Sequence, residues 1–160
     1  MPSYLLLRGN DSGLLGCVRF LPSQGPTMLN EAFPVLLPAG PIDGSADVWE
    51  SSRFALDVHA DVPKAAAGLA APTYELFAGM VEFGLAHGLK AILTVTDVRM
   101  ERILRRAQWP LERLGVARAI GNTTAVAGYL DVSKHALQRL RSLGGLKGPV
   151  LWAPVVQSAA

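Results

Sequence analysis

The sequence has a single cysteine, Cys17, among its 160 residues. One cysteine excludes an internal disulfide and a zinc site built from several cysteines. The three histidines, His59, His87 and His135, are scattered without the short spacings of metal ligands, so the sequence predicts no metal site. We interpret Cys17 as a small hydrophobic side chain buried in a strand.

Long hydrophobic runs are also absent. Half of the residues are hydrophobic, but no apolar run reaches the roughly 18 residues that a membrane helix requires. The first eight residues lack a basic start and are too short to form a signal peptide. We therefore expect a soluble, cytoplasmic protein. Its length suits one domain over residues 1–160, with a hydrophobic core.

Several functional motifs are missing. There is no glycine-rich phosphate loop, no Gly-x-Ser-x-Gly elbow of a nucleophilic serine and no zinc finger. An aromatic-rich RNA-binding pattern and an evident helix-turn-helix are absent too, so nucleic acid ranks low as a partner.

The charge is small overall but unevenly distributed. Residues 1–97 hold 5 Lys and Arg against 10 Asp and Glu, whereas residues 98–160 hold 10 against 3. The two parts therefore carry net charges of −5 and +7. Such asymmetry predicts a basic face that binds an acidic partner.

The hydrophobic pattern predicts alternating strands and helices. Strands are expected over residues 4–8, 14–20, 53–58, 91–96, 124–132 and 149–156, and helices over 27–37, 73–87, 98–107 and 134–143. Residues 38–47 read as a loop, and residues 61–71 as a loop or a frayed turn. Asp97 and Ser133 are expected to cap the helices that they precede. This order predicts a three-layer α/β/α sandwich with a mixed central sheet.

Glu50 and Arg53 are the first candidate for chemistry, because both charges enter an apolar strand. They form either a surface salt bridge or a general base with a cation that orients the substrate. Regular strand alternation puts them on opposite faces, but a bulge at Ser51-Ser52 would bring them together. Their spacing alone does not decide between the two interpretations.

Three segments in order make the pattern more specific. They are Arg19-Phe20, then Pro26-Thr27-Met28-Leu29 with Phe33, and then Glu50-Ser51-Ser52-Arg53-Phe54. In order and spacing they resemble the LuxI-type acyl-homoserine-lactone synthases, over roughly residues 3–132. The run 94–106, closing on Trp109, resembles the strand and helix that border the acyl pocket of that family. Trp109, Met80 and Phe83 fit either an acyl tunnel or an ordinary core.

This resemblance implies a sheet core of the acetyltransferase (GCN5-related) type. The implied reaction is the N-acylation of S-adenosylmethionine by an acyl thioester on acyl carrier protein, followed by lactone closure. S-adenosylmethionine is then a substrate, and no cofactor is implied. The acetyl-coenzyme A signature of ordinary acetyltransferases, (Gln/Arg)-x-x-Gly-x-(Gly/Ala), is missing after residues 94–96, which favours the synthase subgroup.

The resemblance also implies roles for particular residues. Glu50 matches the general base, and Arg19 and Arg53 match arginines that support the active-site network and the S-adenosylmethionine side. Ser52 and Phe54 are expected to bind substrate, with backbone amides near Phe54 facing the oxyanion.

Thr94 is either only a good strand former or a substrate contact. At the matching position, family members with threonine tend to favour acyl chains oxygenated at the third carbon, which a hydroxyl can hydrogen-bond.

Arg99, Arg102 and Arg106 recur at helical spacing on the helix expected after Asp97. They form either a solvated charged face or a docking patch for acyl carrier protein, which is strongly acidic. Reversal of such charges would then weaken the use of the acyl donor.

The sequence departs from the family at its start, because Pro2-Ser3 directly precedes the first strand. The helical cap that the family carries before this strand is expected to be missing, leaving apolar surface exposed. Two other functions therefore stay open. One is a GCN5-related N-acyltransferase that uses acyl-coenzyme A, and the other is an inactive remnant that binds acyl carrier protein.

Overall fold

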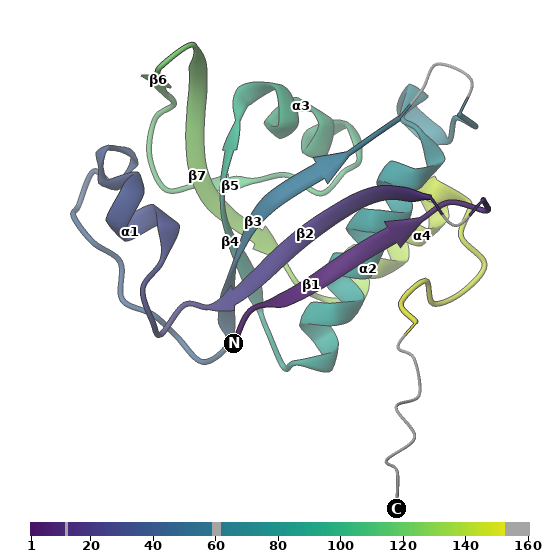
Figure 1. Cartoon of the computed structure of the whole chain (residues 1–160), viewed down its shortest axis with the longest axis horizontal. Helices are drawn as coiled ribbons and strands as arrows, with labels where there is room; N and C mark the ends of the chain where they lie inside the picture. The colour runs from purple at the N-terminus through teal and green to yellow at the C-terminus, as the bar shows by residue number, and fades with distance from the viewer. Residues whose placement is uncertain (12, 59–61, 153–160) are drawn as a thin grey trace, which may run out of the picture.

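A computed structural model describes residues 1–11, 13–58 and 62–152. One seven-stranded mixed sheet runs through the molecule (Figure 1). Its order is β1-β2-β3-β4-β7-β5, with β6 pairing to β7. Only β3 and β4 are parallel, and every other pair is antiparallel. The strands are β1 (Ser3–Arg8), β2 (Leu14–Pro22), β3 (Val48–Leu56), β4 (Ala91–Asp97), β5 (Glu112–Arg113), β6 (Arg118–Ile120) and β7 (Thr123–Asp131).

Helices cover both faces of this sheet, as the predicted α/β sandwich requires. Figure 1 shows α2 and α4 side by side behind the sheet, and α1 at the left of the view. Helix α1 packs on the face opposite to α2 and α4. The helices are α1 (Met28–Ala32), α2 (Ala71–Ala86), α3 (Val98–Arg106) and α4 (Lys134–Gly144), with short 3-10 turns η1 (Pro34–Leu36) and η2 (Ala66–Gly68). None of the helices within the described residues is long and apolar enough to cross a membrane.

The hydrophobic core lies in two parts, one on each face of the sheet. The larger part joins α2, α3 and α4 to the sheet and includes Phe20, Phe77 and Ile92. The smaller part lies under α1 and η1 and includes Leu29 and Leu93. Ile92 and Leu93 follow each other in β4 and therefore point to opposite faces. Around β4 both faces of the sheet are therefore packed.

The predicted helix caps are confirmed. The Asp97 carboxylate accepts the backbone N–H of Met100 at 2.8 Å, and the Ser133 hydroxyl accepts that of Ala136 at 3.0 Å. Each bond satisfies one of the backbone donors that a helix start leaves free. These two caps fix where α3 leaves β4 and where α4 leaves β7.

Some predicted boundaries were wrong for identifiable reasons. The helix expected over 27–37 breaks at Pro34, which cannot continue the hydrogen-bond ladder, and splits into α1 and η1. The strand expected from residue 53 begins at Val48, because its polar residues 50 and 51 are buried rather than exposed. Helix α2 starts at Ala71, with Pro72 in its first turn.

The two short strands β5 and β6 were missed, since two or three residues carry no readable period. No strand forms over residues 149–152, and the remainder of the strand expected over 149–156 lies outside the described residues. Residues 38–47 form neither a helix nor a strand, as predicted.

A β-bulge interrupts the pairing of β2 with β3. Cys17 pairs with Ala55 and Arg19 pairs with Ser52, so Arg53 and Phe54 together stand opposite the single residue Val18. The predicted bulge therefore exists, but it lies at Arg53-Phe54 rather than at Ser51-Ser52. Two residues against one is the definition of a bulge, and the extra residue reverses the alternation of side chains beyond it.

Arg53 takes the strained position of the bulge, with φ of 54°. Residues with a Cβ rarely adopt this left-handed conformation, which costs about 1–2 kcal/mol. Strain of this kind persists where the surrounding structure imposes it, and it is commonest at functional sites.

The strain at Arg53 predicts a stability change. Because glycine adopts a positive φ without steric cost, we expect Arg53→Gly to raise the free energy of unfolding by roughly 0.5–1 kcal/mol. Arg53→Ala is the matched control, since it removes the same guanidinium but keeps the Cβ. Urea denaturation measures both. Equal stabilities for the two variants would contradict a strained bulge.

Candidate active site

The bulge lies where β3 separates from β4. The two strands pair only from Val48 with Ala91 to Ser51 with Thr94. Beyond that point β3 continues against β2 as far as Leu56, whereas β4 continues against β7 as far as Asp97. Figure 1 shows β4 leading into α3 while β3 runs away from it. A parallel pair that stops halfway opens a gap within the sheet.

An apolar cavity of about 30 Å³ fills this gap, and we call it the inner cavity. Side chains of α2 and α3 form part of its wall, and it is lined by Ser51, Phe54, Phe77, Met80, Thr94, Thr96, Met100, Leu104, Trp109 and Leu130. Seven of these side chains are apolar, and Ser51 and Thr94 are neighbours in the last β3–β4 pair. Such a lining suits a hydrocarbon chain that carries a polar group near one end.

The bulge is what brings Phe54 to this cavity. Without it, Ser51 and Phe54 would point to opposite faces of β3. With the extra residue both side chains line the inner cavity, and the Phe54 ring lies 6.0 Å from that of Phe77 between centroids. The predicted substrate residues Phe54 and Thr94 are therefore brought together.

The opposite face of the same strands carries the polar residues. Tyr4, Arg19 and Ser52 are direct partners across β1, β2 and β3, so their side chains share this face. The Arg19 Nε donates to the Ser52 hydroxyl at 3.0 Å. Tyr4 and Leu6 are each 54% exposed on this face.

Glu50 lies on the Arg19 side of β3 but beneath α1, with only 1% of its surface exposed. One carboxylate oxygen accepts the backbone N–H of Met28 at 2.7 Å, and the other accepts that of Leu29 at 3.0 Å. A negative charge is stabilised at the start of a helix, where these amides have no partner within the helix. Glu50 therefore joins the start of α1 to the sheet.

Arg53 projects from the bulge and is exposed. Its backbone carbonyl accepts the thiol of Cys17 at 3.5 Å. Cys17 is half-buried rather than fully buried as expected, because it faces the polar side of β2 beside the bulge.

The three arginines predicted for docking lie on the exposed side of α3. Arg99 and Arg102 are exposed and have no hydrogen-bond or ion-pair partner within the described residues. Arg106 is exposed too, but its guanidinium donates to the carbonyl of Ala67 in η2. Arg106 therefore holds a turn in place, and Arg99 and Arg102 form the free part of the patch.

The opposite side of α3 is fixed by the buried carboxylate of Glu101, whose partner in β5 the sequence pattern did not predict. Glu101, 4% exposed, accepts two hydrogen bonds from Arg113 in β5, at 2.6 and 2.7 Å. Arg105, one helical turn further along α3, also pairs with Glu101, but at the longer distance of 3.9 Å. The hydrogen bonds and positive charge of Arg113 hold the pKa of Glu101 below its ordinary value.

Met80 and Trp109 both line the inner cavity. From the sequence they fitted either an acyl tunnel or an ordinary core. Phe83, named beside them, packs instead against Phe20 with ring centroids 4.5 Å apart. Thr96 was missed, although it follows Thr94 by two residues and so shares its face of β4. Met100 was missed as well, although it precedes Leu104 by one helical turn.

Within the residues that the structure describes, no group of three or more His, Cys, Asp and Glu is placed to hold a metal ion. His59, one of the three histidines, lies outside those residues. The His87 ring stacks on Phe83 at a centroid distance of 4.1 Å.

The sequence and the fold were compared with those of known proteins. The profile of the family described as "Autoinducer synthase" matches residues 1–140. An acyl-homoserine-lactone synthase of Agrobacterium fabrum is 42% identical over 159 residues, which is 99% of this chain and 75% of that protein. Among the curated relatives of highest identity, the chain spans between 66% and 75% of their length.

Solved structures agree with the sequence matches. The apo form of TofI superposes with a TM-score of 0.72 at 32% identity, covering 87% of this chain and 72% of TofI. MesI, described as a CoA-dependent acyl-homoserine lactone synthase, superposes with a TM-score of 0.77 at 25% identity, over 93% of this chain and 71% of MesI. The sequence profile, the identity and the shared fold agree, and the chain belongs to the autoinducer synthase family.

Proposed function

We propose that this chain synthesises an N-acyl-homoserine lactone from S-adenosylmethionine and an acyl thioester. The observation that carries the proposal is the inner cavity at the divergence of β3 and β4, bordered by the strand Glu50-Ser51-Ser52-Arg53-Phe54. An apolar cavity directly beside a strained, polar strand suits a reaction that joins a hydrocarbon chain to a charged amino acid.

The first step is acyl transfer. The amine of S-adenosylmethionine loses a proton and attacks the thioester carbonyl carbon, so a C–N bond forms, the C–S bond breaks and the thiol leaves. The carbonyl oxygen carries negative charge in the intermediate. We assign its stabilisation to backbone amides beside Phe54, since the extra residue of the bulge frees donors from the β2–β3 ladder.

In the second step the acylated amino acid closes its ring. The carboxylate oxygen attacks the carbon that bears the sulfonium, so a C–O bond forms, the C–S bond breaks and methylthioadenosine leaves. Arg19, with Ser52 and Arg53, is the group of polar residues that we assign to the amino acid side. Their face of the sheet is open to solvent beside Tyr4, and Arg19 is oriented by its bond to Ser52.

Glu50 is our candidate for accepting the amine proton, directly or through one water. Each of its oxygens accepts one backbone N–H, and a carboxylate oxygen has a second lone pair. Its burial beneath α1 means that α1 has to stay in register for the carboxylate to act, so Glu50 and α1 function as one unit.

The acyl donor is either acyl carrier protein or coenzyme A. The exposed pair Arg99 and Arg102 on α3 favours acyl carrier protein, an acidic partner, because α3 also lines the inner cavity through Met100 and Leu104. The likeness to MesI, described as CoA-dependent, favours the second candidate, acyl-coenzyme A. We expect the reaction to take place in the cytoplasm.

Mass spectrometry of the products tests the function. The purified chain is mixed with S-adenosylmethionine and a set of thioesters on acyl carrier protein or coenzyme A, and we expect an acyl-homoserine lactone. Glu50→Gln should lower the rate by about 10²–10⁴-fold, as expected for a lost general base.

Thr27→Ala is the matched control for Glu50. The Thr27 hydroxyl also caps α1, accepting the N–H of Asn30 at 3.1 Å, whereas Glu50 accepts the N–H groups of Met28 and Leu29. If both variants lose the same activity, Glu50 acts only by holding α1. If no lactone forms from the unaltered chain but acyl carrier protein binds without S-adenosylmethionine, the chain is a binding remnant instead.

Thr94 predicts the oxidation state of the acyl chain. Its hydroxyl lies in the otherwise largely apolar inner cavity, next to Ser51, so we expect a preference for 3-oxo or 3-hydroxy chains over unsubstituted ones. Thr94→Gly should reduce that preference by about tenfold, the value of one hydrogen bond. Competition between matched donors, read by mass spectrometry, measures it. An unchanged product ratio would rule out this role.

Charge reversal on α3 tests the docking patch. Arg99→Glu with Arg102→Glu should raise the KM for acyl carrier protein donors by about tenfold at low salt, and less at high salt. Donors on plain pantetheine should be unaffected. Lys134→Glu with Lys147→Glu, an equal charge change at exposed sites on and beyond α4, is the control. Equal effects from both pairs would show that only net charge matters.

A further inference from the structure

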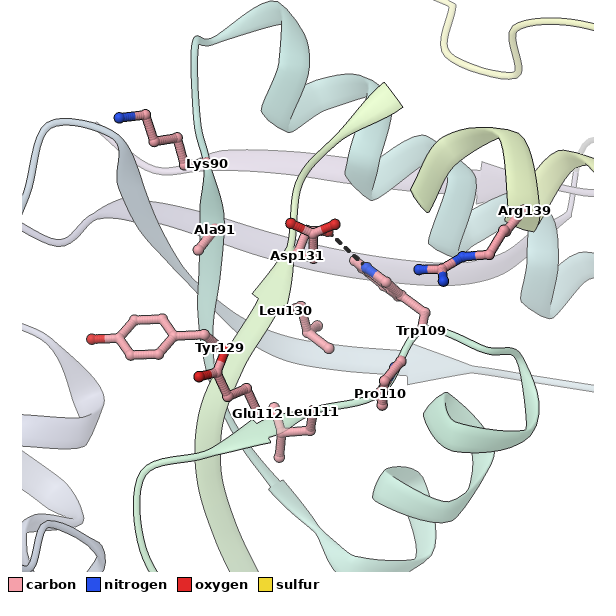
Figure 2. A pocket seen from close by; sticks show the side chains of 10 residues that line it. All are labelled: Lys90, Ala91, Trp109, Pro110, Leu111, Glu112, Tyr129, Leu130, Asp131 and Arg139. Atoms are coloured by element: carbon pink, nitrogen blue, oxygen red, sulfur yellow. Dashed lines mark hydrogen bonds between the residues drawn. The ribbon is translucent and has the colours of Figure 1, made fainter. Parts of the chain in front are cut away.

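A second hollow lies on the surface at the far end of β4 and β7, and we call it the surface pocket. Its volume is about 370 Å³, much larger than that of the inner cavity. Figure 2 shows its charged and polar rim, formed by Lys90, Glu112, Tyr129, Asp131 and Arg139. Nothing in the proposed reaction uses this pocket.

The two hollows share two lining residues, Trp109 and Leu130. Both are almost completely buried, with 1% and 2% of their surface exposed. Because each residue borders the inner cavity on one side and the surface pocket on the other, together they form the partition between them. This partition closes the inner cavity at the end opposite the charged strand of the active site.

Trp109 is held firmly in the partition. Gln108 turns the chain with φ of 57°, and the Trp109 backbone N–H donates to the carbonyl of Leu104 at 2.9 Å. The indole Nε1 donates to the carbonyl of Asp131 at 2.8 Å, the bond drawn as a dashed line in Figure 2. The ring packs against Phe77 with centroids 5.4 Å apart. An indole fixed by these contacts cannot move aside cheaply for a longer ligand.

We propose that Trp109 and Leu130 set the upper length of the acyl chain, and that a shorter side chain at either position lets longer chains pass into the surface pocket. This inference rests on the proposed function, because it assigns a limit to the same acyl site. The inner cavity is small and its other walls include Met80 and Met100, which adapt readily. The rigid partition of Trp109 and Leu130 is therefore the element that limits how long an acyl chain the inner cavity can hold.

The surface pocket explains why acyl chains longer than the limit would gain little affinity. Its rim is charged, so a methyl terminus gains little by reaching it, whereas the buried indole gives the chain an apolar end. Behind the rim, the partition leads to the apolar residues Ala91, Pro110 and Leu111. Once the partition is opened, each further methylene is buried against these residues and should raise kcat/KM by roughly fourfold.

The test uses acyl thioesters of even-numbered chains from butanoyl to tetradecanoyl. We expect the unaltered protein to use the longest of these donors poorly. Trp109→Leu and Leu130→Ala, which open the partition from its two sides, should each raise the kcat/KM ratio of dodecanoyl to octanoyl donors by at least about tenfold. Trp109→Phe, which keeps a ring but loses the indole bond, should leave the length limit nearly unchanged.

Phe83→Leu is the control, since it shortens a core side chain that lines neither hollow. It should lower stability without changing the length preference. Calorimetric binding of the same acyl-coenzyme A series gives a second readout that needs no turnover. If the unaltered protein makes lactone but neither open variant shifts towards longer chains, the partition has no such role. If no lactone forms with any donor, the proposed function fails, and a shift in binding alone still supports the partition.

Discussion

The β-bulge opposite Val18 is the constraint on which the rest of the site depends. One extra residue in β3 changes which side chains beyond it face which side of the sheet, so Phe54 joins Ser51 at the inner cavity, whereas Ser52, which precedes the bulge, shares the other face with Arg19. The same strand thus presents an apolar wall to one side and polar groups to the other. A regular strand would have mixed the two sets on each face.

The bulge also coincides with the end of the β3–β4 pairing, and the two features support each other. A bulged strand bends and twists more strongly, which favours its departure from β4 after Ser51. The departing strands leave backbone groups that a continuous sheet would pair, and in the proposed reaction these groups are available to the acyl thioester. The left-handed Arg53 is the local energetic cost of this arrangement.

In the proposed reaction, Glu50 combines a structural role with that of general base. Its burial would be costly for a lone charge, but the two amides at the start of α1 compensate that cost. They also fix the orientation of the carboxylate, which a general base needs. The arrangement ties the chemistry to α1, so the segment Thr27-Met28-Leu29 matters to the site although none of its side chains has been assigned to a substrate.

Local features of this fold were predictable and tertiary ones were not. The caps Asp97 and Ser133 act on their own helices within a few residues, so their sequence signals are complete. The family motif predicted Glu50 and Arg53 on one strand because that order is itself the signal, but it did not indicate that Glu50 and Thr94 face opposite sides of the sheet. The position of the bulge, the burial of Glu50 and the Arg106 contact with Ala67 depend on how distant segments meet, and no spacing along the chain encodes them.

Helix α3 connects the two ends of the proposed reaction. Its outer side carries Arg99 and Arg102, while Met100 and Leu104 on its inner side form a wall of the cavity. Its position relative to the sheet is fixed by Asp97 at its start and by Glu101, whose buried carboxylate is bound twice by Arg113. Loss of Arg113, which is itself exposed, would leave the buried Glu101 carboxylate without its two hydrogen bonds, so the pair holds α3 in one place rather than several. A carrier that docks on the outer side of a helix held in this way would meet a cavity wall whose shape is already set, and acyl selection would then fall to the fixed partition at its end.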